Sequence, residues 1–173
     1  MTSGDLPAPR RFYGKYRGTV ENNVDPMQLG RVQVRCPVVL GSGRMSWAMP
    51  CTPYAGDGVG LFLVPPVGAH VWVEFEGGDP DSPILGGCFW GPGQVPASPA
   101  VAEVKMFRTD SVSVEVSDLP GAGGIRISVG SPAVTGGITI DATSSGVEIA
   151  MGKGKIALSP VSVSINDGAL EVT

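Results

Sequence analysis

Four acidic residues lie close together in the segment VEFEGGDPDSP, and their types and spacing could do chemistry. They are Glu74, Glu76, Asp79 and Asp81. Two carboxylates that converge on one pocket can act as a general acid and a general base. A larger set of oxygen ligands in a defined loop can bind calcium. The first question is therefore whether the surrounding sequence brings these four side chains together.

The residues around these acids predict a hairpin turn rather than a reactive site. In residues 70–76, valine and phenylalanine alternate with tryptophan and glutamate, as in a half-exposed strand. Gly77 and Gly78 permit the positive φ of a turn, Pro80 fixes its own φ, and the aspartates can accept hydrogen bonds from backbone N–H groups. Because a strand and a tight turn do not make two carboxylates converge, we predict neither acid–base catalysis nor a calcium site here.

No other residue type offers a reactive constellation. His70 is the single histidine, and no serine or cysteine nucleophile with a matching acid lies beside it. Cys36, Cys51 and Cys88 are odd in number and lack CxxC spacing, which argues against a disulfide framework and a zinc site. We therefore predict three buried free thiols, no catalytic residue, no metal and no cofactor.

Composition narrows the class of protein further. The 173 residues include 26 glycines and 16 prolines, which fall between short alternating runs and predict the turns of an all-β protein. No apolar run approaches the roughly 18 residues of a membrane helix. The start, MTSGDLPAPRR, has no apolar core of a secretory signal, so we expect synthesis in the cytoplasm without a signal peptide. The net charge of −4 gives no electrostatic reason to bind nucleic acid.

The chain has two halves of different composition. All eleven aromatic residues lie at or before Phe107, and ten lie within the first 90 residues. We place a Pro/Gly/Ser-rich linker at 92–100, an N-terminal extension at 1–11, a barrel at 12–91 and a β-repeat region at 101–173. No helical period is evident, and five short alternating runs in the first half predict a five-stranded Greek-key barrel of the OB type. These runs are residues 12–20, 30–36, 60–65, 70–76 and 83–90.

Apolar residues in the second half alternate in short runs that recur every 7–13 residues and predict strands. These runs are residues 112–116, 125–129, 138–140, 147–151, 156–158, 161–165 and 170–172. This region has about 70 residues and no aromatic after Phe107, so a single copy buries too little surface to stand alone. Three chains around one axis would cover every apolar face and leave no long sheet edge exposed. We therefore predict an intertwined trimeric β-helix, or β-prism, with an apolar interior and charges outside, among them Asp141, Glu148, Lys153 and Lys155.

Three aromatic residues of the barrel allow two interpretations. Trp47, Tyr54 and Trp72 could stack on single-stranded nucleic acid, as aromatics of OB-folds do. No lysine or arginine occurs between Arg44 and Lys105, however, and acids on this stretch would repel phosphate. We therefore expect these aromatics to anchor contacts between barrels of a trimer.

Two long segments carry a resemblance to a known family. YRGTVENNVDPMQLGRVQVRCP and WAMPCTPYAGDGVGLFLVPPVGAHVWVEFEGGDPDSPILGG resemble the OB-fold domain of phage baseplate assembly protein V. The same domain occurs in the valine-glycine repeat spike proteins of type VI secretion. The resemblance covers about residues 16–91 and implies a trimeric central spike of a contractile injection system. It implies a mechanical role in linking hub to tip and piercing an envelope, and no enzymatic activity.

The resemblance also implies partners. The hub baseplate protein is expected to be a separate chain, because few residues precede the first strand, and Arg10 and Arg11 either contact it or are solvated. A PAAR-type tip protein, with a toxin as possible cargo, is expected to dock on the C-terminal strand at Leu170, Glu171, Val172 and Thr173. The particle would be a phage tail or a phage tail-like device, in transient contact with the target envelope.

Two other functions compete with a spike. An OB-fold module that binds a glycan or a single-stranded nucleic acid predicts a monomer or dimer with measurable ligand affinity. An envelope-degrading enzyme predicts turnover of peptidoglycan, which the missing catalytic constellation disfavours. Neither explains a β-repeat region that cannot bury itself.

Overall fold

The computed structural model describes residues 10–172, and nearly all regular structure within them is β-strand. The chain divides into two compact units between Gln94 and Val95. Each unit is described below by itself. The all-β fold class predicted from the alternating apolar residues is confirmed.

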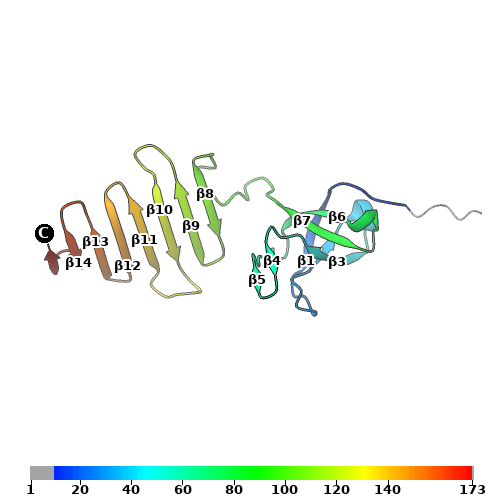
Figure 1. Ribbon diagram of the computed structural model, residues 1–173, viewed down its shortest axis with the longest axis horizontal. Helices are drawn as coiled ribbons and strands as arrows, with labels where there is room; N and C mark the ends of the chain where they lie inside the picture. The colour runs from blue at the N-terminus through cyan, green and yellow to red at the C-terminus, as the bar shows by residue number, and fades with distance from the viewer. Residues whose placement is uncertain (1–9, 173) are drawn as a thin grey trace, which may run out of the picture. The chain divides into compact units, whose positions relative to one another are not determined.

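A closed barrel of five strands makes up most of the first unit (Figure 1). Its strand order is β1-β2-β3-β7-β6, in which β3 and β7 pair in parallel and the other neighbours pair in antiparallel fashion. The predicted five-stranded barrel is confirmed. Its strands are β1 (Tyr16–Asn22), β2 (Val32–Arg35), β3 (Met45–Pro50), β6 (His70–Phe75) and β7 (Pro83–Phe89).

Alternate residues of these strands point inward and form the core of the barrel. The apolar set predicted in residues 70–76, Val71, Val73 and Phe75, is buried, whereas the residues between them are half-exposed. Phe75 also contacts the rings of Phe12 and Tyr16, with centroids 6.2 and 5.8 Å away. The remaining buried hydrophobic residues are Val20, Val32, Val34, Cys36, Leu40, Ala48 and Leu85.

The barrel corrects several details predicted from the sequence. The segment 60–65 is not a barrel strand: only Gly60 is in a strand, β5 (Val59–Gly60), which pairs with β4 (Ala55–Gly56) in a separate hairpin. Its run of large apolar residues does not alternate and ends at two prolines, which cannot donate to a ladder. β3, which was not predicted, takes its place in the barrel.

Two further corrections concern helices and thiols. The barrel includes short helical turns, α1 (Pro37–Leu40) and η1 (Glu76–Gly78), where no helix was predicted. Only Cys36 is buried, and burial raises the pKa of its thiol, whereas Cys51 and Cys88 are exposed. Cys36 directly follows β2, belongs to the buried core and precedes the first turn of α1.

A carboxylate clip fixes the loop between β1 and β2. Asp25 accepts hydrogen bonds from the backbone N–H groups of Met27, Leu29 and Arg31 at 3.0, 2.9 and 3.2 Å. The Arg31 guanidinium also binds this carboxylate, with Nη2 2.7 Å from Oδ1, and stacks 5.4 Å from the centre of the Trp47 ring. These bonds, the guanidinium first, hold the pKa of Asp25 well below its usual range. The clip therefore gives the loop one conformation.

We expect Asp25→Asn to remove the pH dependence that this clip contributes to stability. A carboxyl whose pKa is lower in the folded chain stabilises it at neutral pH and loses that effect as the pH falls below about 4, the unfolded value. The free energy of unfolding, measured with urea between pH 7 and pH 2, should depend less steeply on pH in the variant. The difference in slope should correspond to at most about one proton taken up on unfolding. Glu21→Gln, which removes an exposed pair with Arg35, is the control. Equal slopes for Asp25→Asn and wild type would contradict the clip.

The described part of the second unit is one antiparallel sheet of eight strands. Each strand pairs with its neighbours in sequence, and the resulting meander is visible in Figure 1. Seven strands lie where the alternating runs predicted them, and β8, which precedes them, was not predicted. The strands are β8 (Val104–Arg108), β9 (Val112–Ser117), β10 (Gly124–Val129), β11 (Ile138–Thr143), β12 (Gly146–Met151), β13 (Gly154–Leu158), β14 (Val163–Ile165) and β15 (Leu170–Val172). We refer to this sheet as the needle sheet.

Two glycines of the needle sheet lie where no side chain fits. Gly124 and Gly146 open β10 and β12 with φ of 152° and 142°. A Cβ on Gly146 would lie 2.0 Å from the carbonyl oxygen of Leu158, and one on Gly124 would lie 2.2 Å from that of Ala142. Neighbouring strands therefore approach these positions through backbone alone.

We expect Gly146→Ala to destabilise the needle sheet, because the methyl group meets backbone that cannot move without breaking the ladder. Positive φ alone costs roughly 1–2 kcal/mol for a residue with a side chain. The thermal midpoint followed by circular dichroism should fall. Gly130→Ala is the matched control, because nothing lies within 4 Å of a Cβ there. Equal midpoints for the two variants would contradict the close approach.

Candidate functional site

The acidic residues that opened the sequence analysis do not converge. Glu74 pairs with Lys15 at 2.7 Å, and Asp81 pairs with Arg44. Asp79 accepts a hydrogen bond from the backbone N–H of Asp81 at 3.0 Å, and β6 and β7 pair as a hairpin around this turn. The predicted hairpin is confirmed. Among residues 10–172, no group of three or more His, Cys, Asp or Glu residues could hold a metal ion.

The needle sheet has one face that is apolar along β9 to β15. On β8 the same face carries Phe107, opposite Val114, and Lys105, opposite Val116. The cross-strand register places Ile127 opposite Val114 and Ile140, and it continues through Ile149 and Ile156 to the last strand. No described residue of the second unit is buried, and the large side chains of this face stay open, with Ile149 45% and Leu158 50% exposed. The apolar face comprises Phe107, Val112, Val114, Val116, Ile125, Ile127, Val129, Ile138, Ile140, Ala142, Val147, Ile149, Met151, Ile156, Leu158, Val163, Ile165, Leu170 and Val172.

The opposite face of the needle sheet carries ion pairs. Arg126 pairs with Asp141 across β10 and β11, which raises the pKa of the guanidinium. Lys155 contacts Glu148 at 3.5 Å and also pairs with Asp167, which raises its pKa, Asp167 being the larger cause. Asp141, Glu148 and Lys155 thus lie on the polar face, as expected for the outside of a prism. Lys153 lies in the turn between β12 and β13 instead.

The three barrel aromatics predicted as contacts lie in separate surroundings. Trp47, on β3, is half-buried beneath Arg31. Trp72, on β6, stacks against Phe89, and the Arg17 guanidinium lies 5.0 Å from the Trp72 ring centre. Tyr54 precedes β4 and is exposed. Since β3 and β6 are not neighbours in the barrel, the structure does not gather these aromatics into one platform.

The predicted terminal contacts are partly described. Arg10 and Arg11 are exposed, and Arg10 lies 5.3 Å from the centre of the Phe12 ring. Leu170 and Val172 belong to β15 and are exposed on the apolar face. Glu171 lies between them in the same strand. Thr173 lies outside the described residues.

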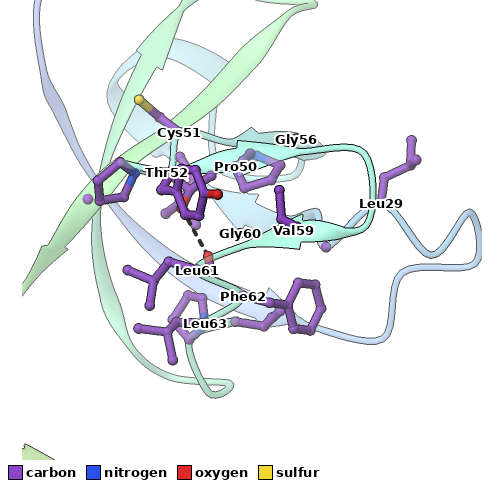
Figure 2. Close-up of a pocket in the computed structure, with 18 of the residues that line it drawn as sticks. Leu29, Pro50, Cys51, Thr52, Gly56, Val59, Gly60, Leu61, Phe62 and Leu63 are labelled. Atoms are coloured by element: carbon purple, nitrogen blue, oxygen red, sulfur yellow. Dashed lines mark hydrogen bonds between the residues drawn. The ribbon is translucent and has the colours of Figure 1, made fainter.

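A second apolar surface, which the sequence analysis missed, is a cleft of about 740 Å³ beside the β4–β5 hairpin (Figure 2). It is lined by residues 28–30, 50–56 and 58–65 and by part of β7, and no charged side chain is among its lining residues. The side chains of Val59, Leu61, Phe62 and Leu63 remain exposed around it. The hairpin is fixed by hydrogen bonds from Leu61 N to Tyr54 O at 2.8 Å and from Thr52 Oγ1 to Leu61 O at 3.0 Å.

This arrangement is typical of a subunit of an assembly. A closed barrel precedes a sheet whose whole apolar face lacks a cover within its own unit, so its stable form needs other protein surface. No helix among the described residues is long and apolar enough to cross a membrane.

Comparison with known protein families gives this subunit a class. Residues 16–90 match the type VI secretion system/phage-baseplate injector OB domain, and residues 103–171 match the phage baseplate V C-terminal trimerisation domain. The chain belongs to the phage baseplate V family of spike proteins. It is a structural component of the injection baseplate, and it carries a trimerisation domain.

The chain is also similar to a named relative. It is 36% identical over 78 residues to the type VI secretion system spike protein VgrG4b of Pseudomonas aeruginosa. The match covers 45% of this chain and 9% of that relative. The chain is thus a distant homologue that shares a short segment with a much longer protein.

Proposed function

We propose that three copies of this chain form the central spike of a contractile injection system, link its hub to its tip, and pierce the target envelope. The observation that supports this most is the open apolar face of the needle sheet, which falls within the matched trimerisation domain. Three such faces turned toward one axis would form a dry interior with the ion pairs outside. In that arrangement residues 101–173 are the needle, 12–91 the barrel, 92–100 the linker and 1–11 an extension.

A needle of this kind suits the transmission of axial force. Every strand from β9 to β14 is hydrogen-bonded on both edges within its own chain. Local opening would expose apolar surface and break ladders at the same time, which makes bending and fraying costly. The proposed role is therefore mechanical, and it belongs to the baseplate of a phage tail or of a phage tail-like particle.

The proposed partners follow from the two ends of the chain. Arg10 and Arg11 are exposed and available to a separate hub protein. The strand with Leu170, Glu171 and Val172, followed by Thr173, is the proposed seat of a PAAR-type tip protein, which could carry a toxin. Trp47, Tyr54 and Trp72 remain proposed contacts within the hub and trimer, in three places rather than one.

Particles from a host that expresses a tagged copy of the chain test this function. Quantitative mass spectrometry of purified particles should give three copies per baseplate, and electron microscopy should place the tag at the baseplate end. Particles should release dye from target-cell envelopes only when the spike is present. A copy number that is not a multiple of three, or undiminished dye release by particles that lack the chain, would contradict the proposal.

A further inference from the structure

The cleft beside the β4–β5 hairpin requires a partner that the barrel itself does not supply. Its exposed apolar side chains include Phe62 at 77% and Leu63 at 57% exposure. The Phe62 ring lies over Gly30, 2.9 Å from where a Cβ of that glycine would be. Exposed apolar side chains around a cleft without charged lining residues are typical of a protein–protein contact.

The same barrel presents a rigid apolar protrusion. The loop of residues 23–30 exposes Val24 at 76% and Met27 at 63%. The Asp25 clip holds its backbone, and Asn23 Nδ2 donates to Pro65 O at 3.2 Å. Neither Val24 nor Met27 lines the cleft of its own barrel. A loop that is already ordered loses little conformational entropy when it binds, so it is suited to bind in a cleft of another protein.

A second copy of this chain fits the cleft better than a freely diffusing protein. The cleft is uncharged, and it therefore lacks the electrostatic complementarity that steers separate partners together. The trimerisation domain lies on the same chain, with only residues 90–103 between β7 and β8. A connection this short keeps the barrels of a trimer at an effective concentration in the mM range, at which a small apolar contact suffices.

We propose that Val24 and Met27 of each barrel enter the cleft of the neighbouring copy, so that the barrels form a closed ring of three contacts. The contact joins two different surfaces, protrusion and cleft, and three such head-to-tail contacts close on a threefold axis. This proposal rests on the trimer proposed above. In this proposal the barrels contribute to assembly of the trimer. Residues 23–30 of one copy and residues 50–65 of the next form the contact that closes the ring.

Photo-cross-linking of the full-length protein tests the contact. Phe62→benzoylphenylalanine places a light-activated ketone at the cleft, and illumination should join chains through residues 23–30 of a neighbour. Val38→benzoylphenylalanine, on the exposed α1, is the control and should give no interchain product. Absence of an interchain product, or products that map to another part of the neighbouring chain, would overturn the assignment.

Maleimide labelling of Cys51 tests the same contact without changing residue 62, where a substitution could disturb the local structure. Cys51 lines the cleft and is exposed in a single chain, so a neighbour should protect it from maleimide. Met27→Asp should speed its labelling at least tenfold while the full-length protein stays trimeric by light scattering, and Val38→Asp should change neither. A trimer with rapidly labelled wild-type Cys51 would refute the ring alone. A monomeric mass would refute the proposed spike as well.

Discussion

Ile149→Asp is expected to convert the protein from a trimer to separate chains at micromolar concentration. Ile149 lies in the middle of the apolar face, opposite Ile140 and Ile156. A carboxylate without a partner costs several kcal/mol in an apolar interior, and the threefold axis places three of them close together. Since each 1.4 kcal/mol is about a tenfold change in an equilibrium constant, the association should be lost over the accessible range of concentrations.

Ala150→Asp is the matched control for this prediction. It introduces the same carboxylate at the adjacent residue, which the register places on the polar face opposite Lys155. The new charge there should be tolerated, and the trimer should persist. Sedimentation velocity distinguishes the two variants directly. If Ile149→Asp remained trimeric, or if both variants dissociated alike, the apolar face would not be the assembly surface.

Phe75→Ala is expected to destabilise the barrel without dissociating the needle. Phe75 is 6% exposed and packs on the rings of Phe12 and Tyr16. Truncation of a buried phenylalanine costs about 3–5 kcal/mol, a large part of the stability of a small domain. All described buried residues lie between Gly18 and Leu85, so this loss falls on the first unit alone.

The distribution of tryptophan makes this prediction measurable in one sample. The three tryptophans, Trp47, Trp72 and Trp90, all precede residue 95, so their fluorescence reports only the barrel. In Phe75→Ala the fluorescence transition should move to lower urea, while the mass by light scattering stays trimeric. Val38→Ala, which truncates an exposed side chain, should leave both unchanged. Loss of the trimer in Phe75→Ala would show that the two units do not fold independently.

The strands of the needle sheet were predictable because their pattern is local. From Val112 to Val172 the apolar residues recur with period two, and glycine or serine separates most runs, so face and register follow from the sequence. The same argument predicts that one face stays apolar and uncovered. β8 was not predicted because its apolar residues do not alternate on one face. Val104 and Met106 lie on the polar face, whereas Phe107 lies on the apolar face.

The barrel was less predictable because burial there depends on tertiary packing. β3 contains a single buried residue, Ala48, so no alternation marks it as a barrel strand. The run Leu61–Leu63 is apolar enough to suggest a strand, yet its side chains surround the cleft instead. The cleft joins residues from distant parts of the chain, and no local pattern in the sequence indicates that they meet.

The most direct test of the account is the solution mass of the full-length protein at micromolar concentration. We predict a species of three chains of 17.7 kDa each, measured by light scattering and unchanged on dilution. The apolar interior between the three sheets should also resist brief exposure to SDS without heating. A monomer at these concentrations would leave the apolar face of the needle sheet open to water and would contradict the central claim.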